Sequence, residues 1–271
     1  MDAAPTDKQV ATKKSGEAFR SVFSSQTFSF VGFGTTKRKV KQNVYIFAEE
    51  QPDGSFVTRS LNKHFIPSGK TKKISKEQLL KGFLPEPDLY LNKVLPMLRK
   101  VRGMVDTADA HRNQGELMSA EFEYKNALRV DEEHIRATFG LGLTYLERGE
   151  LDNANLVCRR IITLDSAFGE ANKHLFNEFG IQMRKHTMYA QALRYYFKAY
   201  RLTKNDEHLL YNISRTYYEK GKLKLAMKFL NMALELNADF PEAETLSRVI
   251  AKKSGQSLSS ADSTWLGPLE D

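Results

Sequence analysis

Two short stretches of this chain carry residues that bind phosphate in nucleotide-dependent proteins. The Ser-Gly-Lys-Thr stretch at 68–71 has the ending of a phosphate-binding loop, but His64 occupies the place of its first glycine and Pro67 stiffens the segment. The Gly-Phe-Gly stretch at 32–34 is a fragment of a dinucleotide motif and lacks the third glycine. Because both motifs are incomplete, the sequence argues against nucleotide hydrolysis.

Metal and thiol chemistry also lack the residue spacings that they require. None of the six histidines pairs with another histidine or with cysteine at metal-ligand spacing. The single cysteine, Cys158, excludes an internal disulfide and falls in a repeated column of large side chains, so we expect it in the core. We therefore predict a protein that is not an enzyme and that holds no metal or cofactor.

The excess of basic residues lies in the first 100 residues of the chain. This segment holds 18 Lys and Arg against 9 Asp and Glu, whereas residues 101–271 hold 23 against 24. The basic clusters are Lys37, Arg38, Lys39 and Lys41, followed by Lys70, Lys72 and Lys73. Such clusters can bind phosphates or an acidic partner surface, but they can also be solvated charge runs. Both interpretations stay open.

A pattern that occurs four times between residues 101 and 239 must organise most of the fold. Gly-Glu-Leu at 115–117 returns at 149–151 and as Gly-Lys-Leu at 221–223, with 187–189 in the third copy. Three further columns share spacings of 34, 38 and 34 residues: Ala120, Ala154, Ala192 and Ala226; Ala127, Ile161, Ala199 and Ala233; Ala108, Gly142, Gly180 and Ser214. Small residues mark close helix contacts and glycine suits a helix C-terminus, so each repeat is predicted to be a helical hairpin.

These columns resemble the tetratricopeptide repeat family. The resemblance covers about half of the chain and implies a mainly α-helical solenoid of about four repeats, closed by a capping helix at 241–253. The chain departs from the family in the column where proline is usual, which holds Glu132, Ser166, Lys204 and Ala238. Four extra residues between Leu164 and Phe176 predict a lengthened helix or loop.

The resemblance also implies where a partner binds, because in this family the first helix of each hairpin lines a groove. The matching positions are Arg102, Arg112, Arg136, Phe139, Leu143, Asn177, Ile181, His208, Tyr211, Asn212 and Arg215. We expect an apolar middle at 139, 143, 181 and 211, edged by the arginines at 112, 136 and 215. Val105 and Asp109 replace residues with which some members clamp a terminal carboxylate. An extended or helical peptide with apolar anchors and some acidic character fits better.

The segment ahead of the repeats is predicted to be a small basic α+β region. Residues 44–48 and 55–61 are β-rich runs on either side of a Pro-Asp-Gly turn, which predicts a hairpin. We expect a short strand at 28–33 and a helix at 74–83 with Ser75 as its cap. A second helix at 88–99 should kink or restart at its proline, residue 96.

Four segments follow from these patterns: a disordered leader at 1–26, the α+β region at 27–87, the solenoid with its capping helix at 88–253, and a flexible tail at 254–271. No apolar run approaches membrane-spanning length, so we expect a cytoplasmic protein without membrane insertion. The repeats predict a chaperone-like scaffold or adaptor that binds a partner protein or peptide in the groove. The alternative is a nucleic-acid or anionic-surface binding protein that uses the basic clusters, while the repeats recruit partners.

Overall fold

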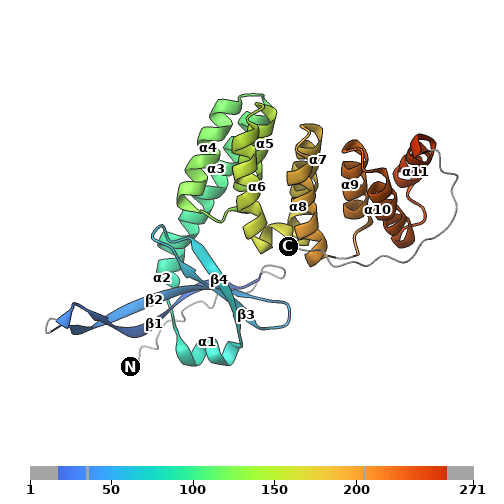
Figure 1. Cartoon of the computed structure of the whole chain (residues 1–271). Coiled ribbons are helices and arrows are strands. Elements are labelled where there is room, and N and C mark those ends of the chain that lie inside the picture. The colour runs from blue at the N-terminus through green and yellow to red at the C-terminus, as the bar shows by residue number, and fades with distance from the viewer. Residues whose placement is uncertain (1–17, 35–36, 204, 255–271) are drawn as a thin grey trace, which may run out of the picture. The chain divides into compact units, whose positions relative to one another are not determined.

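The chain forms two compact units (Figure 1). The computed structural model describes residues 18–34, 37–203 and 205–254. The first unit contains the residues up to Met104 together with 129–132, and the second contains the remainder. Most of the predicted leader and all but the first residue of the predicted tail lie outside the described residues.

A five-stranded antiparallel sheet is the basis of the first unit. Its strands are β1 (Arg20–Val31), β2 (Arg38–Glu50), β3 (Phe56–Leu61), β4 (Pro67–Ile74) and the two-residue β5 (Leu84–Pro85), in the spatial order β4-β3-β2-β1-β5. The predicted hairpin is confirmed as β2 and β3. In its turn Gly54 has φ 77°, and Asp53 Oδ1 accepts a hydrogen bond from the N–H of Ser55 at 3.0 Å.

Strands β1 and β4 differ most from the prediction. β1 begins at Arg20, inside the expected leader, and spans 12 residues instead of the short strand expected at 28–33. β4 has no counterpart among the predicted elements, because proline, glycine and lysine are depleted in strands. It is an edge strand, where lysines discourage pairing with other chains. The 68–71 stretch therefore lies in a strand and not in a phosphate-binding loop.

The helical segments of the first unit follow β4 and β5 in sequence. They are α1 (Lys76–Gly82), α2 (Pro87–Leu89), a π-helical turn at Tyr90–Val94 and α3 (Leu95–Asn113), which continues into the second unit. α1 has the predicted cap, since Ser75 and Gln78 exchange side-chain to backbone hydrogen bonds. α3 restarts one residue before Pro96, as predicted for a residue that cannot donate a backbone hydrogen bond.

Both faces of the sheet are covered where all the strands meet. Successive residues of a strand point to opposite faces. Phe23 packs on one face with Leu79 of α1. Val22 and Phe47 pack on the other face with Val94 of the π-helical turn. The core of this unit is therefore two thin apolar layers on either side of the sheet.

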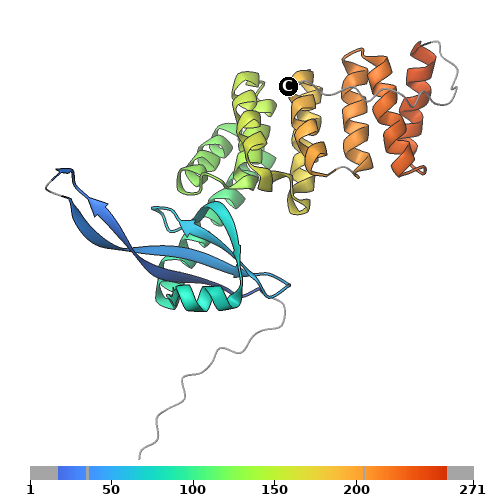
Figure 2. The same cartoon turned by 60° about the horizontal axis from the view of Figure 1, so that its bottom comes forward.

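Helical hairpins stacked in sequence make up the second unit (Figures 1 and 2). Its helices after α3 are α4 (Leu117–Val130), α5 (Ile135–Glu147), α6 (Leu151–Thr163), α7 (Lys173–Lys185), α8 (Tyr189–Leu202), α9 (Glu207–Glu219), α10 (Leu223–Leu236) and α11 (Pro241–Ser254). The predicted mainly α-helical solenoid with its capping helix is thus confirmed. α11 packs Ala243, Leu246 and Ile250 against Ala226 of α10, whereas Val249 of the same helix is exposed.

The turns within the four hairpins share one backbone conformation. Gly115, Gly149 and Gly221 have φ values of 78°, 74° and 78°, and Thr187 has φ 58° in the third copy. In each turn the next residue donates its N–H to a carbonyl five residues earlier, at 2.8 to 2.9 Å. This left-handed arrangement ends an α-helix. At 187 a threonine therefore adopts the conformation for which the other copies use glycine.

Small residues pack where the repeats predict close helix contacts. A Cβ atom added at Gly180 would lie 2.5 Å from the ring of Tyr196, and one added at Gly142 would lie 2.7 Å from the ring of Phe179. Ser214 in the same column is fully buried. All residues of the two alanine-rich columns are also buried. The predicted register of the repeats is correct.

The extra residues of the third interval, for which a lengthened helix or loop was expected, form a longer connection that contains two 3-10 turns. The turns are Asp165–Phe168 and Glu170–Asn172, and they connect α6 to α7. The ring of Phe168 packs against those of Phe176 and Tyr195, with centroids 5.7 and 5.6 Å apart. The insertion thus adds an aromatic side chain to the contact between α7 and α8.

Candidate functional site

The first helices of the hairpins form one layer of the second unit. α5 contacts α7 and α7 contacts α9 in this layer, while α6 contacts α8 in the layer of second helices. All predicted groove residues lie on α3, α5, α7 and α9. Arg102 is exposed in the part of α3 that belongs to the first unit. The other ten lie in the second unit.

Two of the four residues expected in the apolar middle of the groove are buried. Phe139 and Leu143 on α5 are completely buried, and the ring of Phe139 meets that of Phe179 with centroids 5.9 Å apart. Every residue of α5 from 137 to 146 is buried, so this helix has no exposed stripe. Asn212 on α9 is buried as well. The prediction that these three residues line an open groove is therefore wrong.

Arg112 connects three helices of the layer. Its guanidinium contacts Glu147 on α5 at 2.8 Å and Glu178 on α7 at 3.3 Å, and only 16% of its side chain is exposed. Burial opposes the charge of Arg112, but attraction by Glu147 raises its pKa above the usual value. This arginine is an ionic bridge between repeats and not the free groove edge that the sequence predicted.

The other groove arginines are paired in the same way. Arg136 on α5 contacts Asp109 on α3 at 2.5 Å. Arg215 on α9 contacts Glu219 at 3.1 Å, and Glu219 also binds Arg184 on α7. We call the ion pairs of arginines 112, 136, 184 and 215 the arginine ladder. Because acids of the same layer neutralise these cations, the layer offers little attraction to a strongly acidic peptide.

Five predicted groove residues remain accessible on α7 and α9, and we call them the α7–α9 patch: Asn177, Ile181, His208, Tyr211 and Arg215. The side chain of His208 is 58% exposed and that of Arg215 is 41% exposed. The rings of His208 and Tyr211 both contact Phe240, with centroids 5.0 and 5.2 Å away. The patch combines apolar area, an amide, an imidazole and a guanidinium.

The predicted basic residues of the first unit form two separate clusters. Lys39 and Lys41 lie on the part of β2 near the β1–β2 turn. Lys72 on β4 lies opposite Thr58, which in turn pairs with Ala48 near the other end of β2. About eight strand residues separate the clusters, which corresponds to about 27 Å. They do not form one patch.

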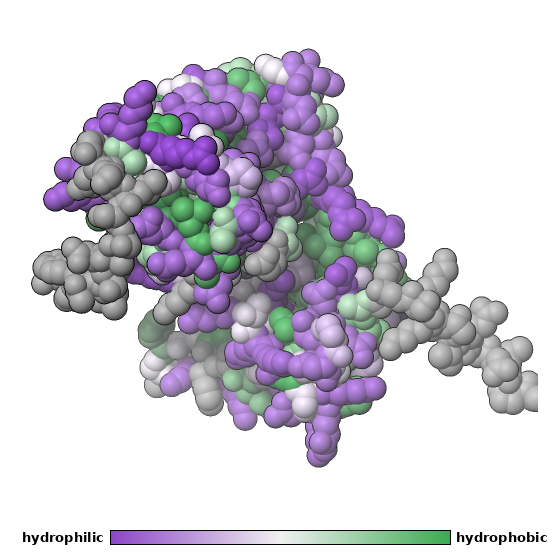
Figure 3. All heavy atoms as spheres, turned by 90° about the vertical axis from the view of Figure 1, so that its right-hand side faces the viewer, coloured by the Kyte–Doolittle hydropathy of each residue, from purple (hydrophilic) through white to green (hydrophobic). Residues whose placement is uncertain are grey.

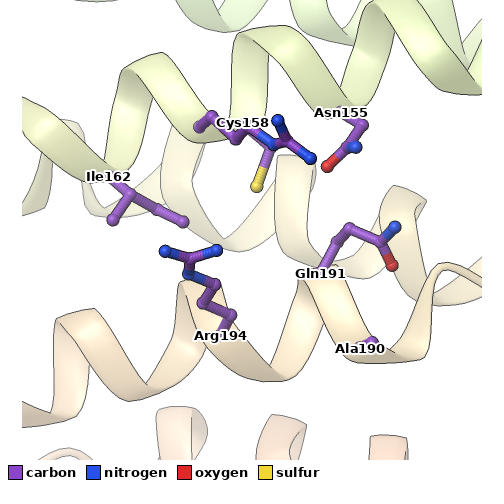
Figure 4. A pocket seen from close by; sticks show the side chains of 7 residues that line it. Asn155, Cys158, Ile162, Ala190, Gln191 and Arg194 are labelled. Atoms are coloured by element: carbon purple, nitrogen blue, oxygen red, sulfur yellow. The ribbon is translucent and has the colours of Figure 1, made fainter. Parts of the chain in front are cut away.

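A cavity of about 200 Å³ lies between α6 and α8 (Figure 4). It is lined by Asn155, Cys158, Arg159, Ile162, Ala190, Gln191 and Arg194. Cys158 is buried, which raises the pKa of its thiol to about 12 although Arg194 opposes the shift. The prediction of a core cysteine is confirmed. The cavity itself was not predicted, because polar residues on a helix surface give no sign that two helices leave a gap.

Hydrophilic side chains predominate on the face that Figure 3 shows, and hydrophobic ones gather only in small patches. Within the described ranges, no three His, Cys, Asp or Glu side chains come together as a metal site. None of the helices that the structure describes is long and apolar enough to span a bilayer.

The family models that match this chain cover its repeat region. Two family models described as tetratricopeptide repeat match residues 105–167 and 184–250. No curated protein matches the chain. A solved structure of PilF from Pseudomonas aeruginosa is 17% identical with a TM-score of 0.45, over 57% of this chain and 69% of that chain. A MamA structure is 19% identical with a TM-score of 0.46, over 57% and 82%. MamA from Desulfovibrio magneticus RS-1 is 14% identical with a TM-score of 0.45, over 58% and 86%.

The matched ranges coincide with the hairpins and their left-handed turns. Residues 105–167 span the first two turns, and residues 184–250 span the last two together with most of α11. Neither match bears on the nucleic-acid alternative. Residues 105–167 and 184–250 of this chain are therefore tetratricopeptide repeats, which support a role as a protein-interaction scaffold in general.

Proposed function

We propose that this protein is a non-enzymatic scaffold that binds a segment of a partner protein on the α7–α9 patch. One observation carries the proposal: the predicted groove residues Phe139 and Leu143 on α5 are buried, whereas their counterparts on α7 and α9 are accessible. A partner can contact only accessible side chains. The patch is therefore the part of the first-helix layer that suits binding.

The chemistry of the patch fits a segment with one or two apolar anchors. Ile181 and Tyr211 offer partly exposed apolar area, and Asn177 can both donate and accept hydrogen bonds. Arg215 remains 41% exposed while it is bonded to Glu219, so it can also contact one carboxylate. A segment with apolar anchors and a single acidic group fits this surface better than a strongly acidic one.

The ion pairs of the arginine ladder fix the helices that carry the α7–α9 patch before a partner binds. Arg112 joins α3, α5 and α7, and Glu219 joins α9 to α7 through Arg184. These links hold the two helices of the patch at a fixed spacing. A surface that is already ordered loses less entropy when it binds. We therefore expect the patch to bind its partner without a large rearrangement.

A pair of matched double variants tests the proposal. Asn177→Ala with Ile181→Ser removes an amide and an apolar side chain from α7, and Asn153→Ala with Leu156→Ser removes the same groups from α6. The partner is captured from the source cell with the full-length wild-type protein, identified, and titrated against both variants. We expect about a 30-fold loss of affinity for the α7 variant, as for an interface hot spot, and little change for the α6 variant. Equal affinities of the wild type and the α7 variant would refute the assignment.

A further inference from the structure

The β1–β2 hairpin extends beyond the rest of the first unit (Figures 1 and 2). β3 pairs with β2 only from Ile46 onward, and β5 pairs with β1 only at Phe23 and Ser24. Residues 25–31 and 38–45 therefore form a ribbon beside which the structure describes no third strand. We call this ribbon, with residues 32–34 and 37 at its end, the β-arm.

Large apolar side chains are exposed on the β-arm. Phe28 is 59% exposed, Val31 is 50% exposed and Phe33 at the turn is 95% exposed, whereas Val22 and Phe47 nearer the core are buried. A two-stranded ribbon is only marginally stable in water. These exposed side chains do not contribute to a core, and apolar side chains gathered on one projection mark an interaction site.

The β-arm is also strongly basic. Its cations are Lys37, Arg38, Lys39 and Lys41, and no Asp or Glu occurs between residues 26 and 48. Arg38 lies opposite Val31 and Lys41 lies opposite Phe28. The Nζ atom of Lys39 is 4.2 Å from the centre of the Phe28 ring. Because directly opposite residues share a face and successive residues alternate, Phe28 lies with Lys39 and Lys41 on one face of the ribbon, whereas Val31 and Arg38 lie on the other.

The position of Phe28 beside Lys39 and Lys41 distinguishes between the possible anionic partners. A membrane surface takes apolar side chains that gather on one face, but the exposed Phe28 and Val31 point to opposite faces of the ribbon. Every nucleotide of a single strand presents a base and a phosphate, which match an aromatic ring and a neighbouring cation. In a duplex the faces of the bases are stacked on one another and do not reach such rings.

We propose that the β-arm binds single-stranded nucleic acid. Bases stack on Phe28, and on Phe33 at the turn, while Lys39 and Lys41 contact the phosphates. Phe28, Lys39 and Lys41 lie on one face that both strands present, so the backbone of the nucleic acid follows β2 and its bases lie over β1. This activity is separate from the α7–α9 patch and does not depend on it.

The test measures fluorescence anisotropy of a labelled oligothymidylate of about 20 nucleotides with the full-length protein, between about 50 and 300 mM NaCl. The contacts of Lys39 and Lys41 to two phosphates predict that log K falls with log salt with a slope of about −1.4 or steeper. Lys39→Gln with Lys41→Gln should reduce this slope by about 1.4 and weaken binding about 25-fold at about 0.1 M salt. Phe28→Ser should weaken binding about fivefold or more without changing the slope.

The matched control is Lys70→Gln with Lys72→Gln, which removes the same charge from β4. We expect this variant to bind within about twofold of the wild type, since only contacted phosphates contribute to the slope. Equal losses in both double variants would overturn the proposal, as would the absence of binding at the lowest salt concentration. Binding to phosphatidylserine vesicles but not to the oligonucleotide would overturn it in favour of a membrane.

Discussion

Replacing Thr187 with glycine should stabilise this protein. Thr187 is exposed and adopts φ 58° at the end of α7, where a side chain costs about 1–2 kcal/mol through the clash of its Cβ with the backbone. Glycine removes this strain but gives the unfolded chain more freedom, which costs about 0.4–1 kcal/mol. The free energy of unfolding should therefore rise by about 0.5–1 kcal/mol.

Urea unfolding and thermal melts measure this effect. One kcal/mol changes the Tm of a protein of this size by about 2–4 °C, so Thr187→Gly should raise the Tm by about 1–4 °C. Gly149→Thr is the matched control, because it places threonine in an equivalent turn with φ 74° and should lower stability by about 0.5–1 kcal/mol. Thr187→Ala keeps the Cβ atom and should change stability little.

The reasoning fails if Thr187→Gly destabilises the protein while Gly149→Thr leaves it unchanged. That result would show that the third turn is held by contacts of the threonine side chain and not by the left-handed conformation that the four copies share.

Three further predictions concern packing, pH and the thiol. Gly180→Ala should destabilise the protein by about 1–3 kcal/mol, because the new Cβ would lie 2.5 Å from the ring of Tyr196; an unchanged urea midpoint would contradict the close contact of α7 and α8. Burial opposes the charge of Glu121, but hydrogen bonds from Lys125, Tyr145 and Arg148 lower its pKa below 4.5. Because its pKa is lower in the folded state, its stabilisation is present above about pH 4.5 and is lost as the pH falls through the folded value. Glu121→Gln should therefore flatten the decline of stability below about pH 4.5, and unchanged acid unfolding would count against these hydrogen bonds. Cys158 has a pKa of about 12, so at about pH 8 it should react with DTNB only when urea unfolds the protein; rapid reaction of the native protein would show an accessible thiol.

The repeat region could be predicted because the contacts within a hairpin are local in sequence. Gly180 and Tyr196 lie on successive helices of one hairpin, so the spacing of small and large residues reveals their contact. The position of Thr187 in the third turn was predicted only from the spacing of the repeats, and Thr187 has the positive φ that the glycines have in the other turns. Such columns show which face of a helix packs against its partner.

The state of the groove could not be predicted in the same way. Whether the side chains of Phe139 and Leu143 are accessible or buried depends on how closely neighbouring repeats pack. The repeated sequence positions carry no information about that distance. The arginine ladder did leave a signal: Arg112 and Glu147 are 35 residues apart, as are Arg184 and Glu219, which is one residue more than the usual repeat. This spacing places the two members of each pair on the first helices of successive repeats.

The first unit was predicted only in part because its strands pair across longer distances. The hairpin of β2 and β3 has a local turn signal in Asp53 and Gly54. β1 pairs with β2 through a connection that has Gly32 and Gly34 in place of an Asp-Gly pair, and β4 is rich in lysine because it is an edge strand. The length of the β-arm could be seen only once these pairings were known.

Hydrogen exchange of the free and partner-bound protein tests the central claim most directly. If a partner segment binds the α7–α9 patch, backbone amides of α7 (Lys173–Lys185) and α9 (Glu207–Glu219) should exchange more slowly in the complex, while those of α6 and α8 stay unchanged. Protection confined to α6 and α8, or to the sheet of the first unit, would contradict the proposal that the accessible part of the first-helix layer binds the partner.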